Sequence, residues 1–475
     1  MPVPHLSRFK VPLVLAVWVG LALGLHLLRF DPYDITEAAA RAMLLDWTVV
    51  DRVTNPVLSL GLPDLRVVLF VPLAVYWTGS IVATKIFVLL IAFLAALFLY
   101  RWACRRMTPE AALIATGLFL IAPLTLSEVN RVGAGPFLLL TFALGQWVDE
   151  RYRRVRRRFG GWYFLQLGLS AVAVSLHPAG IAHPLALMWE WHRNPVDKQH
   201  RVLVTAGLGF TGVLVLIMRL GWPALSWGDN PMAVLTDLVW VMGPNSGGPS
   251  WMMGLIPTMI LLLLIISDFR ALFDDLFGRM LLGGLVFGAV AADAGWAMPA
   301  LVILLYRGTY RLIRFNENLA PGGFAGRRGV TLLVVFVLAT TFMIADKAQR
   351  YDVLAGTVGP EDEAIRVLSG EVEDLKEPAI TVSQWPGRTM LATRQPTFPL
   401  PPSSEKEQDL LGNLRGVRYL LFDPYDKRNA NLKELVAGLP NEMKTIMITS
   451  DAVLVEYIAA DRSPPPPRHD KGRMR

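Results

Sequence analysis

The first apolar run of the chain leads directly into an acidic segment, FDPYDITEAAARAMLLDW, which spans residues 30–47. The carboxylates of Asp31, Asp34 and Glu37 follow the end of that run at intervals of three residues. Carboxylates at this spacing share one face of a helix, and at a membrane surface such groups can act as a general base or hold a divalent cation. The alternative, which composition alone favours, is a solvated acidic loop in which Asp34 caps a helix that begins at Ile35.

The composition of the whole chain is that of a polytopic membrane protein. Of its 475 residues, 53% are hydrophobic and only 18% are charged, whereas a soluble globular chain carries about 25% charged residues. The apolar residues are concentrated in long runs. These features exclude a purely soluble enzyme, a disordered protein and a nucleic-acid module. The net charge of +7 is therefore not taken as a sign of a nucleic-acid partner.

Long apolar runs recur along the first 345 residues. A helix needs roughly 20 apolar residues to cross the core of a bilayer, and on that basis the sequence predicts about 11 transmembrane helices. The short run 180–191 pairs with its predecessor as a hairpin around His177 and Pro178. The predicted helices are 11–29, 80–100, 110–126, 134–148, 161–178, 180–191, 202–220, 252–267, 279–295, 297–313 and 329–345.

Basic residues are concentrated in alternate loops between these runs. One side of the predicted membrane domain holds the clusters 101–106 and 151–158, whereas the first loop on the other side, 30–79, is rich in Asp and Glu. Loops rich in Lys and Arg face the cytosol. The pattern therefore predicts a cytosolic N-terminus and places everything after residue 345 outside the cytosol.

Residues 346–475 differ in character from the preceding chain. Short β-like runs alternate with helical stretches, which is typical of a small α/β domain. Pro-rich stretches at 397–402 and 464–467 indicate extended, linker-like segments. The sequence thus predicts a transmembrane domain over 1–345 and an extracytoplasmic α/β domain with a Pro-rich tail over 346–475. The expected strands are 379–382, 417–422, 445–449 and 453–458, and the expected helices are 363–368 and 431–437.

The succession of elements resembles the GT-C membrane glycosyltransferases, which include protein O-mannosyltransferases and the aminoarabinose transferases that modify lipid A. In those proteins an acidic outer loop carries an A-R-x-M…D-W stretch. The resemblance covers the whole chain in topology and residues 30–185 in motif. The matching residues are Ala40, Arg41, Met43, Asp46 and Trp47, the interfacial segment Arg66–Trp77, then Gly79, Ser80 and Lys85, and the stretch IAPLTLSEVNR that ends at Arg131.

The resemblance implies transfer of a sugar from a polyprenyl-phosphate carrier to a lipid, glycan or protein acceptor outside the cytosol, in a bacterial inner membrane. An acid of the first loop, from Asp31, Asp34 and Glu37, would deprotonate the acceptor hydroxyl. Basic side chains would bind the carrier phosphate through charge-assisted hydrogen bonds, and the candidates are Arg66, Arg131 and His177. The alternative for His177 is a histidine of the headgroup region that is hydrogen-bonded to backbone.

Two departures from the family pattern leave a second function open. The two acids of the family's pair are usually adjacent, whereas here Pro32 and Tyr33 separate Asp31 from Asp34. In the family an acid commonly follows the outer arginine, whereas here Val132 and Gly133 follow Arg131. Glu128 is a candidate for that second acid, and Asp229 is a candidate for contact with the acceptor. The rival hypothesis is a catalytically inactive GT-C-like scaffold that binds partners through its C-terminal domain.

Overall fold

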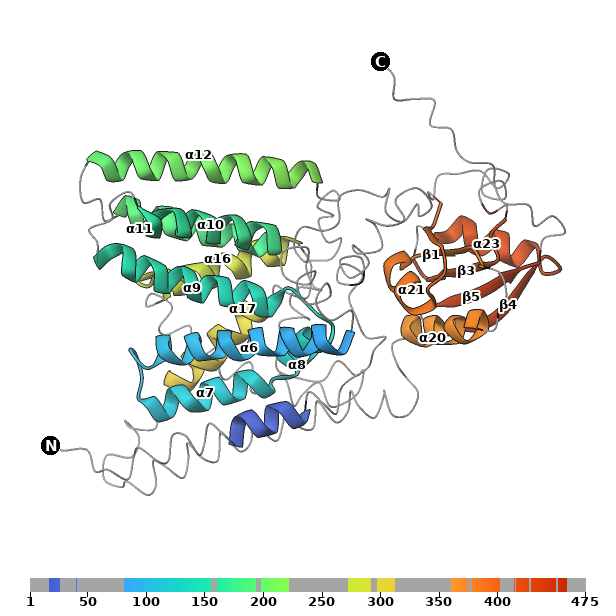
Figure 1. The fold of residues 1–475 in the computed structure, drawn as a ribbon, viewed down its shortest axis with the longest axis horizontal. Helices are drawn as coiled ribbons and strands as arrows, with labels where there is room; N and C mark the ends of the chain where they lie inside the picture. Colours follow the sequence, from blue (N-terminus) through green and yellow to red (C-terminus); the bar gives the residue numbers. More distant parts are fainter. Residues whose placement is uncertain are drawn as a thin grey trace, which may run out of the picture. The chain divides into compact units, whose positions relative to one another are not determined.

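The structure, a computed structural model, divides the chain into two units, one helical and one built around a β-sheet (Figure 1). The predicted boundary between residues 345 and 346 lies outside the residues that it describes and stays a prediction. The described residues are 17–25, 40, 81–154, 160–193, 198–221, 272–291, 297–311, 360–373, 375, 378–401, 414, 416–426, 429–449 and 452–458.

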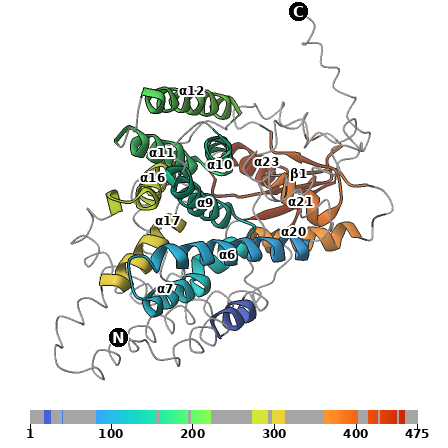
Figure 2. The same cartoon turned by 60° about the vertical axis from the view of Figure 1, so that its left-hand side comes forward.

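Every predicted apolar run that falls at least partly within the described residues is helical over most of its described length. The first run is helical over 17–25, and the runs 252–267 and 329–345 lie outside the described residues. Figures 1 and 2 show α6 between α7 and α9. The helices of this unit are α6 (Ile81–Ala103), α7 (Pro109–Ile121), α8 (Pro123–Asn130), α9 (Gly135–Arg154), α10 (Gly161–Leu176), η2 (Pro178–Ile181), α11 (Ala182–Arg193), α12 (Lys198–Gly221), α16 (Leu276–Ala291), α17 (Ala297–Val302) and the π-helical η4 (Ile303–Arg307).

The predicted helix 110–126 is broken in the structure, because two helices occupy this stretch. Ala122 adopts an extended conformation (φ −61°, ψ 137°) between α7 and α8, and the two helices are bent by 50° relative to one another. Pro123 explains the break, since proline lacks the N–H that a continuous helix needs and biases the preceding residue toward extended backbone. A count of apolar residues alone does not detect this break.

The number of transmembrane helices is not confirmed within the described residues. One described helix, Thr84–Ala103, is long and apolar enough to cross a membrane, and the bent pair Ala111–Ile121 and Leu124–Asn130 would be a second crossing. Gly161–Leu176 and Leu276–Phe287 are apolar but shorter. The count of about 11 therefore stays a prediction.

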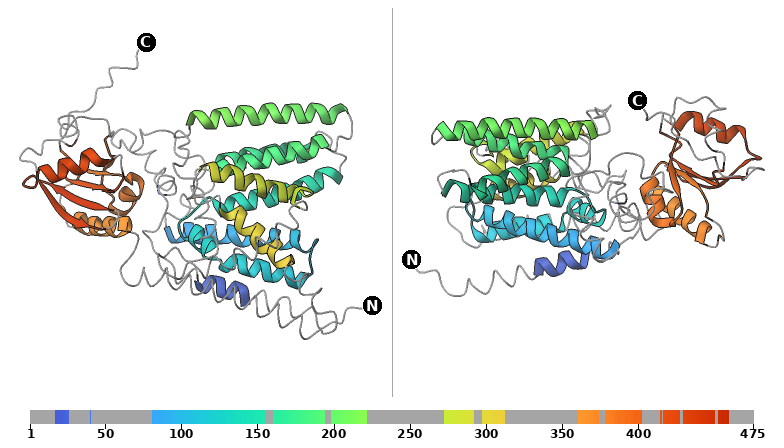
Figure 3. Two further views of the ribbon diagram at one scale, coloured as in Figure 1. Left: turned by 180° about the vertical axis from the view of Figure 1, so that it is seen from behind. Right: turned by 45° about the horizontal axis from the view of Figure 1, so that its top comes forward.

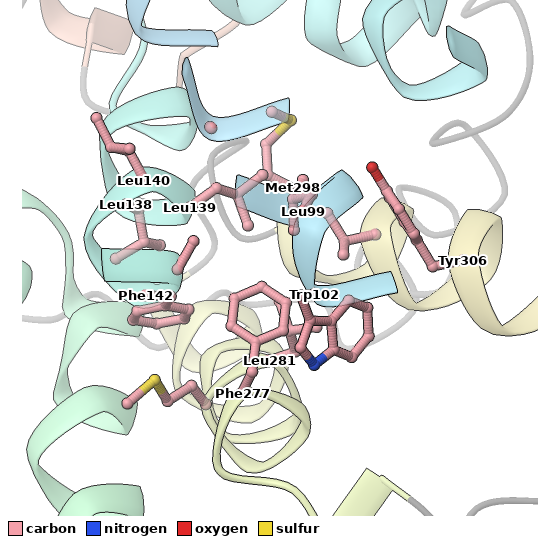
Figure 4. Packing of buried hydrophobic residues seen from close by; sticks show 14 of the residues in the cluster. Leu99, Trp102, Leu138, Leu139, Leu140, Phe142, Phe277, Leu281, Met298 and Tyr306 are labelled. Carbon is pink, nitrogen blue, oxygen red and sulfur yellow. The ribbon is translucent and has the colours of Figure 1, made fainter. Parts of the chain in front are cut away.

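Aromatic side chains from three helices meet near the end of α6 (Figure 4). The Trp102 ring of α6 lies 4.9 Å from that of Phe277 in α16 and 6.0 Å from that of Tyr306 in η4, measured between centroids. The Tyr306 hydroxyl is 2.9 Å from Thr116 Oγ1 in α7. Each such ring pair contributes about 0.5–1.5 kcal/mol beyond area burial, so these contacts fix α6, α7, α16 and η4 against one another.

A buried histidine ties together α9, α10 and α11. His183 Nδ1 lies 3.0 Å from Ser170 Oγ, and its ring stacks on Phe142 at 6.2 Å. The ring edge occupies the space that a side chain at Gly145 would need. The sequence alone does not connect Gly145 with His183, because the two residues meet only when α9 and α11 pack together.

Substitution of Gly145 by alanine is expected to destabilise the helical unit by about 1–3 kcal/mol, because the added methyl overpacks a filled site. Thermal unfolding of the purified protein measures the effect. Gly168→Ala in α10 is the matched control, since no atom lies within 4 Å of the position of its added Cβ. The control should unfold at or above the wild-type temperature because alanine favours helix over glycine. Equal behaviour of the two variants would contradict the packing argument.

The second unit contains a five-stranded mixed sheet with helices on both faces (Figure 3, right). Strand order is β2-β1-β3-β5-β4, in which β1 pairs in parallel with β2 and β3, and β5 pairs antiparallel with β3 and β4. The strands are β1 (Thr381–Ser383), β2 (Thr397–Pro399), β3 (Tyr419–Phe422), β4 (Met443–Ile448) and β5 (Val453–Tyr457), and the helices are α20 (Pro360–Glu373), α21 (Pro386–Thr393) and α23 (Ala430–Gly438).

Alternating side chains of β3 build a core on each face of the sheet. Leu420 and Phe422 pack with Leu432 of α23, whereas Tyr419 and Leu421 pack with α20. The predicted α/β character and the predicted strands and helices of this segment are confirmed. One expectation is wrong: the stretch 397–402 is not all linker, because Thr397–Pro399 forms the edge strand β2. Proline is tolerated there because an edge strand has unpaired backbone on one side.

Candidate functional site

The helices of the first unit alternate in direction, so their polar ends gather at two opposite ends. One of these we call the α8 end. It holds the start of α6, the end of α8, the start of α9 and the end of α10. The other, the arginine end, holds the end of α6, the end of α9 and the start of α10. Ring contacts between Tyr152 and Tyr163, with centroids 6.3 Å apart, join α9 and α10 at the arginine end. The other termini of these two helices therefore meet at the α8 end (Figure 1).

A buried lysine is hydrogen-bonded to the last residue of α8. Lys85 lies in the second turn of α6 and is only 5% exposed, and its Nζ donates to Asn130 Oδ1 at 3.1 Å. Lys85 belongs to a motif that resembles the family, but it was not among the predicted site residues. Its position within an apolar helix is the signal that identifies it, because a charge at such a place is a functional hypothesis by default.

Arg131 follows Asn130 directly, in a tight turn between α8 and α9. The Arg131 amide donates to Ser127 O at 2.8 Å, and Gly133 N donates to Glu128 O at 2.7 Å. The buried Glu128 carboxylate accepts a hydrogen bond from Gly135 N at 3.1 Å. The structure thus brings two predicted site residues, Arg131 and Glu128, into one turn together with the partner of Lys85.

His177 lies between α10 and η2, in the turn that the sequence predicted. Its side chain is fully buried, and its Nδ1 accepts a hydrogen bond from Ala179 N at 3.0 Å. This is the backbone contact that the structural alternative for His177 expected. Because Nδ1 accepts this hydrogen bond, Nε2 is the ring nitrogen that can act as a donor.

The other predicted site residues lie outside the described residues. The same is true of the expected cation ligands. Among the residues that the structure describes, no group of three or more His, Cys, Asp or Glu side chains is arranged to hold a metal ion. A cation site therefore stays a prediction on the first loop. The residues concerned are Asp31, Asp34, Glu37, Arg66 and Asp229.

The arginine end carries a network of ion pairs. Glu190 of α11 pairs with Arg153 at 2.6 Å and with Arg279 of α16. Arg153 also binds Asp149 at 2.6 Å, which accepts from the Trp191 indole N–H at 3.2 Å. Arg106 pairs with Asp275 at 2.8 Å and Arg105 pairs with Glu150. Asp149, Glu150, Glu190 and Asp275 of this end are thus bound to arginines. At the opposite end, Lys85, Arg131 and His177 are the basic candidates for contact with an anionic ligand.

No protein-family model and no curated protein matches the sequence. Solved structures do resemble the fold. The apo oligosaccharyltransferase of Archaeoglobus fulgidus is 12% identical with a TM-score of 0.53, and the match covers 88% of this chain and 70% of that chain. ArnT from Cupriavidus metallidurans in the apo state is 13% identical with a TM-score of 0.54, covering 94% and 98%. ArnT bound to undecaprenyl phosphate is 15% identical with a TM-score of 0.53, covering 94% and 99%.

Both of these proteins are GT-C glycosyltransferases. The chain therefore has a GT-C-like fold, and the fold expected from the resemblance of its motifs is confirmed. The solved structures to which it is similar include an oligosaccharyltransferase and ArnT, and for ArnT the match spans nearly the whole of both chains. At 12–15% identity this likeness concerns the fold, and the assignment of an activity is a separate step.

Proposed function

We propose that the chain is an integral membrane glycosyltransferase, which moves a sugar from a polyprenyl-phosphate carrier to a lipid, glycan or protein acceptor on the extracytoplasmic face. The observation that carries the proposal is the GT-C-like fold, which matches an ArnT structure with bound undecaprenyl phosphate over 94% of this chain. The polar group at the α8 end supports it, because a carrier phosphate needs charge-assisted donors.

An exposed apolar stripe along α6 supports the membrane assignment. Ile86, Leu90, Leu94 and Leu97 recur at helical spacing, and each is 41–60% exposed. Apolar side chains in a contiguous row are unfavourable in water, whereas lipid tails solvate them. The arginine end is expected to face the cytosol, which assigns the α8 end to the extracytoplasmic face of what we propose is a bacterial inner membrane.

In this proposal the carrier phosphate and the acceptor hydroxyl are bound by different parts of the chain. Lys85, Arg131 and His177 bind the carrier phosphate, which is the leaving group, together with Arg66 of the first loop. Asp31, Asp34 or Glu37 deprotonates the acceptor hydroxyl. The alternative role of these carboxylates is to hold a divalent cation. Asp229 is assigned to the acceptor.

Binding of undecaprenyl phosphate to the purified full-length protein tests the carrier site. Replacing Arg131 and His177 together by alanine is expected to weaken binding by at least about tenfold, because each charge-assisted hydrogen bond contributes about 1.5–3 kcal/mol. Arg154→Ala is the matched control, since Arg154 is an exposed arginine of the arginine end. Equal loss in the control, or saturable binding unchanged in the double variant, would contradict the carrier site.

A GT-C-like scaffold without activity is the second candidate function. The observation that favours it is the turn after α8, where Val132 and Gly133 replace the family's second acid and the carboxylate of Glu128 is bound to the backbone of Gly135. A scaffold would bind undecaprenyl phosphate without catalysing transfer. Single-turnover measurements with a polyprenyl-phosphate-linked sugar separate the two functions, because only the enzyme releases the free carrier phosphate.

A further inference from the structure

We propose that Glu128 is a positioning residue for Arg131. This inference rests on the proposed function, since it concerns how the arginine of the carrier-phosphate site is held. In this role the carboxylate exchanges no proton with substrate. It fixes the turn between α8 and α9, so that the guanidinium of Arg131 begins from a defined backbone position.

Glu128 bridges both sides of the turn that carries Arg131. Its backbone carbonyl accepts from Gly133 N at 2.7 Å, which closes the turn from the α8 side. Its Oε2 accepts from Gly135 N at 3.1 Å, which is the first residue of α9. One residue therefore ties the end of α8 to the start of α9, and Arg131 lies inside the loop that these two hydrogen bonds close.

The residues of the turn are adapted to that carboxylate. A Cβ on Gly133 would overlap with the side chain of Glu128, and a Cβ on Gly135 would overlap with Met298 and with Glu128 Oε2. Glycine at position 133 thus leaves the space that the carboxylate fills, and glycine at position 135 leaves room for both side chains. Val132 between them has a φ of 55°, a left-handed conformation that is strained for a β-branched residue. Such strain persists only where the surrounding contacts hold it, and the two hydrogen bonds of Glu128 supply that restraint.

The residue on the other side of Arg131 is fixed as well. Asn130 is buried and accepts from Lys85 Nζ of α6 at 3.1 Å. Arg131 therefore follows a residue anchored to α6 and precedes a turn anchored to α9. Preorganisation of this kind reduces the ordering that ligand binding would otherwise require, so loosening the turn should weaken capture of the carrier more than the chemical step.

A comparison of Glu128→Gln with Glu128→Ala in the full-length protein tests the role. Glutamine keeps an oxygen that accepts from Gly135 N but cannot take up a proton at the working pH. It is expected to retain carrier affinity and kcat within about threefold, whereas alanine should weaken carrier binding and raise KM by about tenfold with a smaller change in kcat. If Glu128 is instead a proton-transferring acid, the glutamine variant will lose kcat and its pH–rate profile will lose one limb.

Gly135→Ala provides a second arm, because its Cβ would overlap with Glu128 Oε2 and disturb the same hydrogen bond while Glu128 stays in place, although it would also overlap with Met298 of α17. It is expected to reproduce the carrier affinity of Glu128→Ala, and thermal unfolding shows whether either variant has merely lost its fold. If the wild type binds the carrier and folded Glu128→Ala binds it with the same affinity, the positioning role alone is overturned. Absence of undecaprenyl phosphate binding by the wild type would overturn the proposed function and this inference together.

Discussion

Sugar transfer by the full-length protein is expected to fall by about 10²–10⁴-fold when Asp31 and Asp34 are both replaced by asparagine, because that is the contribution of a positioned general base. Asparagine has the shape of aspartate and keeps a hydrogen-bonding oxygen, so a capping role at residue 34 would survive the change. The measurement is transfer of a labelled sugar from a polyprenyl-phosphate carrier by the purified protein. Carrier binding should be retained, since the carboxylates are assigned to the acceptor side.

The two single variants and one control show which carboxylate is responsible for the loss of sugar transfer. Asp31→Asn and Asp34→Asn separately identify the base, because only the residue that takes the proton should cause most of the loss. Asp64→Asn is the matched control, since Asp64 lies in the same loop and has no assigned role. Transfer at the wild-type rate by the double variant would exclude this acidic pair as the base. Absence of transfer by the wild type, with carrier binding intact, would favour the scaffold.

Hydropathy predicted the helical unit well because a membrane helix is defined by a long apolar run, and that property is local in sequence. The break at Ala122 and Pro123 is also local, but it depends on backbone geometry that an apolar count ignores. In the C-terminal unit, β2 was missed because a strand is defined by pairing with another segment, which is not a local property of the sequence. Its prolines suggested a linker, and only pairing with β1 makes Thr397–Pro399 a strand.

The positions of two candidate residues in turns were predicted from the sequence, and their roles stay predictions. Arg131 and His177 lie in the turns expected of them, because the alternation of spans fixes which loops share an end. The role of Glu128 could not be predicted from its spacing to Arg131, since the hydrogen bond to Gly135 depends on how the chain turns at Val132. Lys85 was matched to a motif, but its contact with Asn130 requires α6 and α8 to be packed.

The ion pairs of the arginine end are expected to affect the stability of the helical unit, because some of them are buried. Glu190 is bound by two arginines, and the side chains of Glu190 and Arg279 are 5% and 8% exposed. Asp149 is fully buried between Arg153 and Trp191. Because both partners of the Glu190–Arg279 pair are withdrawn from solvent, removing one leaves the other as an uncompensated buried charge.

Glu190→Gln is therefore expected to destabilise the helical unit by about 3–5 kcal/mol, which is the usual consequence of breaking a buried ion pair from one side. Thermal unfolding of the purified protein, supported by denaturant titration, measures the loss. Arg105→Gln is the control at the same end. Arg105 pairs with Glu150 but its side chain is 43% exposed, and exposed pairs contribute only about 0–1 kcal/mol.

A second change distinguishes a buried charge from a simple loss of packing. Glu190→Gln combined with Arg279→Met removes both charges of the buried pair while keeping side-chain volume, and it should recover most of the stability lost in Glu190→Gln alone. Arg153 does not prevent that recovery, because its side chain is 44% exposed and keeps Asp149 as a partner. If the double variant is as unstable as the single one, the cost arises from altered packing among α9, α11 and α16, and the charge argument fails.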